Sequence, residues 1–187
     1  MNDIGALFRE LKDSSNVSYM LSPDLRIMRT NRAWDHFARA NRGELVLERW
    51  GRGALVLDAM HGELRAFYRD AFARALESGE RWEHDFDCNT DQLFQRYRMI
   101  VYPVRRSILV VTSSLEVSIA TGPGEATDAT RYVHDGVIQM CANCRRVKVA
   151  GLDRWDLVPA YVRETPPMTS HGLCPPCART YDSPQLG

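Results

Sequence analysis

The sequence predicts an α+β protein: a five-stranded antiparallel sheet with helices on one face, followed by a small cysteine-rich module. Apolar residues recur at helical spacing in some segments and alternate with polar residues in others, as expected for helices packed on a half-buried sheet. Four of the five cysteines follow residue 140, whereas the first 120 of the 187 residues contain only Cys88. Lys plus Arg and Asp plus Glu both number 24, so no net charge draws the chain onto nucleic acid or an anionic membrane.

The first predicted elements are a short amphipathic helix and a hairpin. Within residues 1–15, apolar residues share one helical face and end at a turn signal. Alternation over residues 17–21, a Ser-Pro-Asp turn and an apolar stretch over residues 25–29 predict two paired strands. Asn31 is placed to cap a helix that continues over residues 34–41.

A longer helix and three further strands complete the predicted domain. Asp58 is expected to cap the long helix and Gly79 to end it. Alternating or continuous apolar residues over 82–88, 97–101 and 108–111 predict the strands, and a polar, glycine-rich stretch follows them. The predicted division is an amphipathic helix, a globular domain, a linker and a cysteine-rich module, at residues 1–15, 16–118, 119–136 and 137–187.

Three short stretches within this predicted domain carry a resemblance to a known family. Asp24-Leu25-Arg26-Ile27, Asn31-Arg32-Ala33-Trp34 and the following 37–41 are similar to the second strand and next helix of many bacterial PAS sensors. The resemblance covers about residues 17–117. It implies a sensing or docking module and not an enzyme, with an amino-terminal helix that often mediates homodimerisation. It also implies a pocket that holds haem, flavin or a metabolite in some members and is filled by side chains in others.

The resemblance leaves the ligand of such a pocket unknown. His36 and His61 are the candidate haem ligands, although a lone histidine on a helix is more often solvated or hydrogen-bonded. Cys88 is read as a small buried hydrophobe, with a redox-sensor role as the alternative. The aromatic residues read as core, and not as a cofactor cage, are Trp34, Phe67, Phe86 and Tyr97.

Two Cys-x-x-Cys pairs predict a structural zinc site. Cys141 and Cys144 form one pair and Cys174 and Cys177 the other, and two such pairs supply the four thiolates of a tetrahedral site. Four cysteines also suit an iron-sulphur cluster, and a third reading leaves them free of metal. His171, three residues before Cys174, is expected to donate a hydrogen bond to the ligands or to replace one of them.

The surroundings of these cysteines resemble a treble-clef zinc finger. A hairpin is expected from residues 147–149 and 155–158 around Gly151, and a helix opens at Cys177. The segment is also similar to Cys-rich segments that follow PAS or receiver domains in bacterial signalling proteins. The basic residues expected to favour the thiolates, or alternatively to contact nucleic-acid phosphates, are Arg145, Arg146 and Lys148.

Catalytic interpretations of the cysteines fit less well. A hydrolytic zinc site keeps one position open for water, whereas four cysteines fill the shell. The zinc deaminases need His-x-Glu, but His134 is followed by Asp135 and Gly136. Cys174-Pro175-Pro176-Cys177 lacks the strand-helix-strand context of dithiol oxidoreductases. We therefore expect no enzymatic activity.

The sequence shows neither a secretory signal nor an apolar stretch that could cross a bilayer, which predicts a cytoplasmic protein with no membrane partner. The leading interpretation is a homodimeric PAS sensor or docking protein that acts by contact with an unidentified signalling partner and carries a structural zinc ion. The alternatives are a transcription-associated factor that binds nucleic acid through its zinc module and a haem- or redox-sensing PAS protein.

Overall fold

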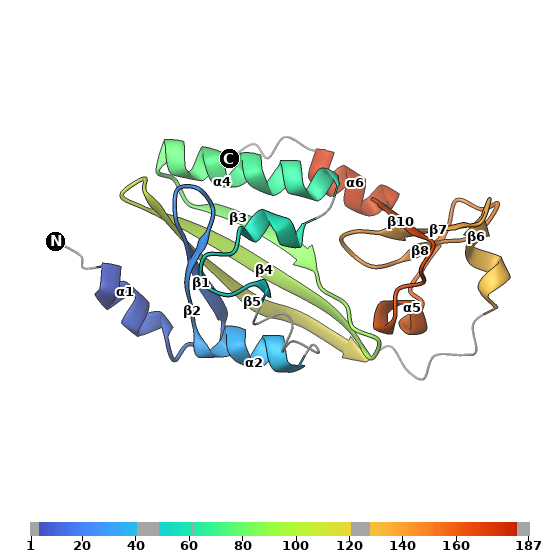
Figure 1. The fold of residues 1–187 in the computed structure, drawn as a ribbon, viewed down its shortest axis with the longest axis horizontal. Helices are drawn as coiled ribbons and strands as arrows, with labels where there is room; N and C mark the ends of the chain where they lie inside the picture. The colour runs from blue at the N-terminus through green and yellow to red at the C-terminus, as the bar shows by residue number, and fades with distance from the viewer. Residues whose placement is uncertain (1–3, 41–48, 61, 121–127, 183–187) are drawn as a thin grey trace. The chain divides into compact units, whose positions relative to one another are not determined.

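The computed structural model describes residues 4–40, 49–60, 62–120 and 128–182, which form two compact units (Figure 1). The first unit comprises Met1–Met60, Tyr68–Asp85 and Arg98–Leu115, and the second comprises His61–Phe67, Phe86–Tyr97 and Glu116–Gly187. Helix α4 (Glu63–Ser78) and the three strands that follow it, between residues 82 and 120, therefore contribute residues to both units. The predicted division into helix, domain, linker and cysteine-rich module stays a prediction.

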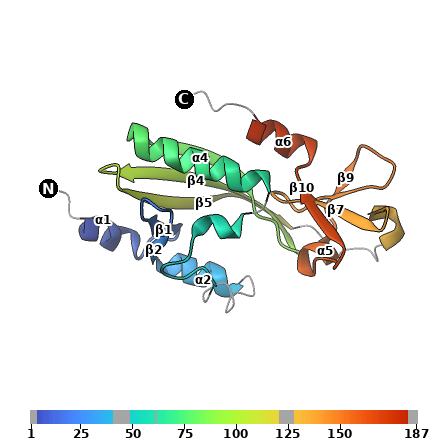
Figure 2. The same cartoon turned by 45° about the horizontal axis from the view of Figure 1, so that its top comes forward.

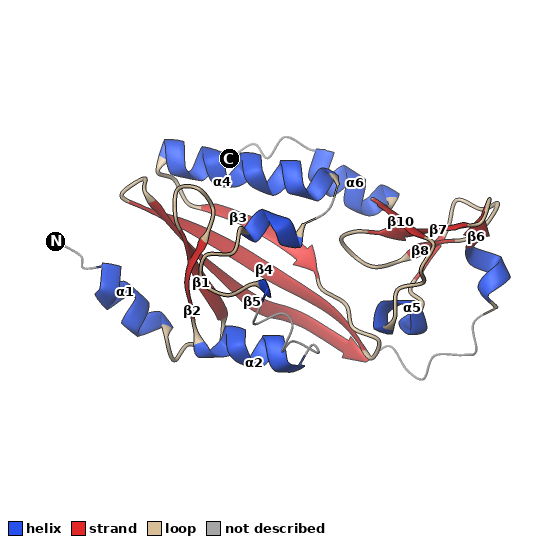
Figure 3. Cartoon of the chain, viewed as in Figure 1, coloured by secondary structure: helices blue, strands red, loops and turns tan. Residues whose placement is uncertain are grey.

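The predicted five-stranded antiparallel sheet is confirmed, with strand order β2-β1-β5-β4-β3 (Figure 3). β1 pairs antiparallel with both β2 and β5, and Val17 to Leu21 of β1 lie opposite Ser113 to Leu109 of β5. The five strands are β1 (Val17–Leu21), β2 (Ile27–Thr30), β3 (Trp82–Asp87), β4 (Leu93–Val104) and β5 (Ile108–Ala120).

Alternate residues of this sheet build the core of the first unit. Tyr19 and Leu21 on β1 and Leu109 and Val111 on β5 are buried on one face, as period-two alternation requires. The helices of this part of the chain are α2 (Arg32–Ala40), the short 3₁₀ helix η1 (Val56–Ala59) and α4 (Glu63–Ser78). α4 packs against β3 through an aromatic cluster of Tyr68, Phe72, Trp82 and His84. The course of α4 along the sheet can be followed in Figure 2.

α1 (Ile4–Leu11) packs against the other face of the sheet. Phe8 of α1 packs against Met20 and Val110, which alternate with the core residues of β1 and β5 and so point the opposite way. The apolar stripe predicted at the amino terminus is therefore covered by the sheet of the same chain.

Asn31 fixes α1, β1 and α2 to one another. Its Oδ1 accepts hydrogen bonds from the backbone N–H of Ser18 and Trp34, both at 3.0 Å. Its Nδ2 donates to the carbonyl oxygens of Leu11 at 3.0 Å and Asn16 at 2.8 Å. The predicted cap of α2 is confirmed, and the same side chain, 1% exposed, also closes the turn after α1.

The long helix does not begin where the sequence predicted. Asp58 lies in η1, Met60 is extended, and Gly62 has a left-handed φ of 56°, so a helical path from Asp58 is interrupted and α4 begins at Glu63. The expected cap at Asp58 is therefore wrong. The helix ends at Ser78, and Gly79, with a φ of 75°, follows it as predicted.

The second unit contains a small sheet of order β10-β7-β8-β9, with β6 paired to β7. The predicted hairpin is confirmed, since Val147 lies opposite Asp156. The strands are β6 (Val133–His134), β7 (Val137–Cys141), β8 (Val147–Lys148), β9 (Trp155–Asp156) and β10 (Thr169–Gly172), and the helices are η2 (Ala129–Tyr132), α5 (Pro159–Arg163) and α6 (Pro175–Asp182).

An apolar core lies within this small sheet and its helices. Ile138 and Met140 of β7 pack with Val147, Val149, Val158 and Tyr132, all of them buried. Asp135 and Gly136, with φ of 47° and 79°, form the two-residue turn between β6 and β7. Among the residues that the structure describes, no helix is both long and apolar enough to cross a membrane.

Candidate metal centre

A tight turn and a parallel strand pair bring the two cysteine pairs together. Cys141 ends β7, and the chain turns back through hydrogen bonds from Arg145 N to Cys141 O at 3.0 Å and from Cys141 N to Arg146 O at 2.8 Å. Arg145 has a left-handed φ of 63° in this turn. β10 runs parallel to β7 with Gly172 beside Cys141, which delivers the second pair to the same end of the sheet.

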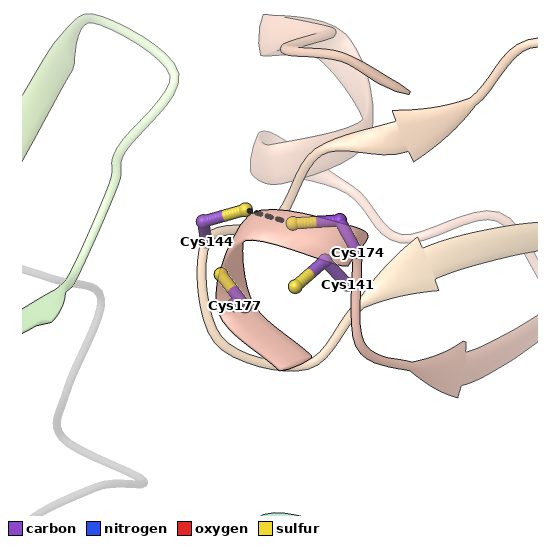
Figure 4. A group of neighbouring side chains, drawn as sticks. All are labelled: Cys141, Cys144, Cys174 and Cys177. Carbon is purple, nitrogen blue, oxygen red and sulfur yellow. Dashed lines mark hydrogen bonds between the residues drawn. The ribbon is translucent and has the colours of Figure 1, made fainter. Parts of the chain in front are cut away.

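The four sulphur atoms form one compact group (Figure 4). One Sγ from each of Cys141, Cys144, Cys174 and Cys177 lies within 4.8 Å of the others, and Cys144 Sγ is 3.6 Å from Cys174 Sγ. A tetrahedral ion with metal–sulphur bonds of about 2.3 Å holds its thiolates about 3.8 Å apart. The donor set therefore fits a single ion bound by all four cysteines.

The cluster is closed to solvent. Cys141, Cys144 and Cys174 are 0% exposed and Cys177 is 6% exposed, with Trp155, Leu173 and Tyr181 packed against them. A metal ion here would have four protein ligands and no open side for water, which is the arrangement of structural sites. The four cysteines could hold a metal ion, and their chemistry suits both zinc and an iron-sulphur cluster.

The thiols strongly affect one another's ionisation. Hydrogen bonds from Cys144 and Cys177 lower the pKa of Cys141. The hydrogen bond with Cys141 is in turn the main cause of the raised pKa of Cys144. It is also the main cause that raises the pKa of Cys177 to about 12. One thiolate is thus stabilised at the expense of its neighbours. A divalent cation among the sulphurs removes this conflict, because each additional thiolate is then attracted to the ion.

The side chains of Asn143 and Arg146 donate hydrogen bonds to the sulphurs. Asn143, between the cysteines of the first pair, donates from Nδ2 to Cys177 Sγ at 3.2 Å, and Tyr181 on α6 donates from its hydroxyl to Asn143 Oδ1 at 2.7 Å. Arg146 Nη1 donates to Cys144 Sγ at 3.7 Å. Such donors offset the negative charge that four thiolates place on a divalent ion.

Sequence reasoning named Arg146 but missed Asn143 and Tyr181. The position of Asn143 inside the first Cys-x-x-Cys pair is the signal that could have identified it. Arg145 donates from Nη2 to Thr165 Oγ1, just after α5, at 3.0 Å. Burial lowers the pKa of Arg145, and Lys148 is half-buried on β8.

The remaining predicted residues lie elsewhere. His171 is exposed on β10 and is not one of the clustered ligands, so its role as a hydrogen-bond donor stays a prediction. His36 is exposed on α2, and His61 falls outside the described residues. Cys88 follows β3 and is half-buried, and burial raises its pKa.

The aromatic residues read as core differ in depth. Tyr97 is 8% exposed, and Phe86 stacks on it with ring centroids 5.6 Å apart. Trp34 is half-buried against Tyr19, with centroids 5.1 Å apart, and Phe67 meets Tyr181 edge to face at 4.7 Å. The ring of Tyr181 thus packs against Phe67 of α4, while its hydroxyl hydrogen-bonds Asn143.

No family model and no curated protein matches the chain. Among solved structures, the phage VqmA-DPO complex is similar with 14% identity and a TM-score of 0.43, covering 60% of this chain and 52% of that one, so the chain spans about half of that protein. The PAS domain of nitrogen regulation protein NR(II) from Vibrio parahaemolyticus has 13% identity and a TM-score of 0.38, covering 62% of this chain and 100% of its own. A PAS domain from a two-component sensor histidine kinase has 8% identity and a TM-score of 0.38, covering 60% of this chain and 95% of its own.

Proposed function

We propose that this chain is a bacterial, cytoplasmic signal-transduction protein in which a PAS-like domain is joined to a treble-clef-like module built on a structural zinc ion. It acts by protein contact, as a homodimer that engages a further signalling protein, and not by catalysis. The burial and mutual proximity of the four cysteines carry the proposal. The PAS-like sheet and the resemblance of residues 17–117 to PAS sensors support the signalling part.

Zinc is proposed to provide folding free energy to the carboxy-terminal module. Among the described residues, the apolar cluster that supports this module has six buried members, Tyr132, Ile138, Met140, Val147, Val149 and Val158. A small core of this kind rarely suffices alone, and a structural zinc ion contributes on the order of 10 kcal/mol in zinc-finger peptides. The metal would therefore decide whether the module presents a defined surface to its partner.

The basic residues favour a structural role over nucleic-acid binding. The guanidinium of Arg146 lies 5.7 Å from the Phe94 ring centroid and donates to a cysteine sulphur, and Arg145 donates to Thr165. Both cations are thus engaged by other residues of the second unit. The haem alternative likewise gains no support from His36, which is exposed on α2.

Limited proteolysis of the full chain tests this proposal. Chelation, or replacement of both Cys144 and Cys174 by serine, is expected to make residues 137–182 protease-sensitive while the PAS-like domain stays resistant. Cys88→Ser is the matched control, because Cys88 lies outside the cluster and should leave the pattern unchanged. Equal resistance of the module in all samples would contradict the proposal.

A further inference from the structure

A buried asparagine hydrogen-bonds the turn between β3 and β4 to the tight turn of residues 141–146, the cysteine knuckle. Asn89, 7% exposed, donates from Nδ2 to the carbonyl oxygen of Cys144 at 2.7 Å. Its Oδ1 accepts the backbone N–H of Gln95 at 2.9 Å. One side chain thus connects the backbone of a candidate metal ligand to the first residues of β4, within the second unit.

Backbone hydrogen bonds on either side of Asn89 order the turn itself. Cys88 N donates to Gln95 O at 2.9 Å and Thr90 N donates to Leu93 O at 2.9 Å. Because Gln95 is also nearly buried, water cannot readily replace the amide of Asn89 if the Cys144 carbonyl moves away. The conformation of residues 88–95 therefore depends on the position of the Cys144 carbonyl oxygen.

Two further contacts join the same turn to the module. The Arg146 guanidinium lies over the Phe94 ring while its Nη1 donates to Cys144 Sγ. Arg163 of α5 pairs with Asp91 at 2.8 Å. Cys144 is thus linked to the turn both from its carbonyl oxygen, through Asn89, and from its sulphur, through Arg146.

We propose that metal binding at the four cysteines and the ordering of the β3–β4 turn are energetically coupled through Asn89, so that metal occupancy sets the state of the turn and the state of the turn sets metal affinity. The inference rests on the proposed function, since it requires a metal ion at the cysteines. Coupling between two sites is reciprocal: a contact that helps the metal to order the turn must help the turn to hold the metal by the same factor. β3 and β4 continue from this turn into the PAS-like sheet, so the coupling offers a route by which a change in that sheet reaches the module.

Amide hydrogen exchange on the full chain, with and without zinc, tests the first half of the coupling. The Gln95 N–H, which donates to Asn89 Oδ1, is expected to exchange about tenfold faster after zinc is removed. A change of this size corresponds to the loss of a single buried hydrogen bond. The amides of β1, in the other unit, serve as the internal reference and should not change. Equal exchange of Gln95 in both samples, with zinc shown to bind, would overturn the proposal.

Zinc affinity of Asn89 variants tests the second half. Asn89→Ala and the isosteric Asn89→Asp, which keeps an acceptor for Gln95 but loses the donor to Cys144, are expected to bind zinc about tenfold more weakly. Gln92→Ala is the matched control, since Gln92 is exposed on the same turn. Unchanged affinity in both Asn89 variants would refute the coupling, whereas failure of the unmodified chain to bind any metal would instead refute the proposed function.

Discussion

Replacing Asn143 by alanine is expected to weaken zinc binding by about 10- to 100-fold. The Asn143 amide donates to Cys177 Sγ at 3.2 Å, and a hydrogen bond to a charged acceptor contributes about 1.5–3 kcal/mol. At about 1.4 kcal/mol for each tenfold change, this loss gives the stated range, which also agrees with the usual effect of removing a partner of a metal ligand.

Tyr181→Phe separates the hydroxyl from the ring. The phenylalanine keeps the edge-to-face contact with Phe67 but no longer donates to Asn143 Oδ1. A neutral hydrogen bond contributes about 0.5–1.5 kcal/mol, so zinc affinity should fall by about 2- to 10-fold. Because the hydroxyl acts through the Asn143 amide, the double variant should bind no more weakly than Asn143→Ala alone.

Competition against a chromogenic chelator at fixed pH measures these affinities in the full chain. Gln139→Ala, an exposed change on β7, is the control and should bind zinc as the unmodified chain does. Unchanged affinity of Asn143→Ala, or strictly additive losses in the double variant, would refute the idea that Tyr181 and Asn143 act as one relay to the sulphur.

Three further predictions concern stability. Burial lowers the pKa of His84 from 6.5 to about 4, so the unfolded chain binds more protons than the folded chain between these pH values. The free energy of unfolding, measured in urea, should therefore be about 1 kcal/mol lower at pH 5.5 than at pH 8. His84→Phe should abolish this loss. Asn31→Ala removes the hydrogen bonds that Oδ1 accepts and those that Nδ2 donates, and should cost about 3 kcal/mol in the same assay. Asn31→Asp should also destabilise, because it keeps the acceptor but turns a second carboxylate oxygen toward the carbonyl oxygens that Nδ2 now contacts. Gly136→Ala should cost about 1 kcal/mol by thermal unfolding, because φ is 79° although nothing lies within 4 Å of the added Cβ, and Gly136→Asn should cost less.

Local sequence patterns were sufficient for most of the sheet. Alternation identified β1 and β3, and Asn31 was recognised as a cap because its side chain acts on backbone three residues away. The start of α4 was missed because the extended conformation of Met60 and the left-handed Gly62 override the capping propensity of Asp58. The β6–β7 hairpin was also missed, although Asp135-Gly136 is a strong two-residue turn signal.

The candidate site was predictable in its ligands and not in its surroundings. Spacing alone paired Cys141 with Cys144 and Cys174 with Cys177, since the two cysteines of each pair are three residues apart. The parallel pairing of β10 with β7, which joins the two pairs, is a contact between segments about 30 residues apart that leaves no local pattern. For the same reason the sequence could not predict the hydrogen bond from Tyr181 to Asn143 or the one from Asn89 to Cys144.

Native mass spectrometry of the full chain, purified without added metal, tests the central claim most directly. The account predicts one zinc ion for each chain, which disappears when Cys144 and Cys174 are both replaced by serine and persists in Cys88→Ser. A chain that carries no metal while its module remains folded would contradict the account, and so would a mass increment matching iron and sulphide.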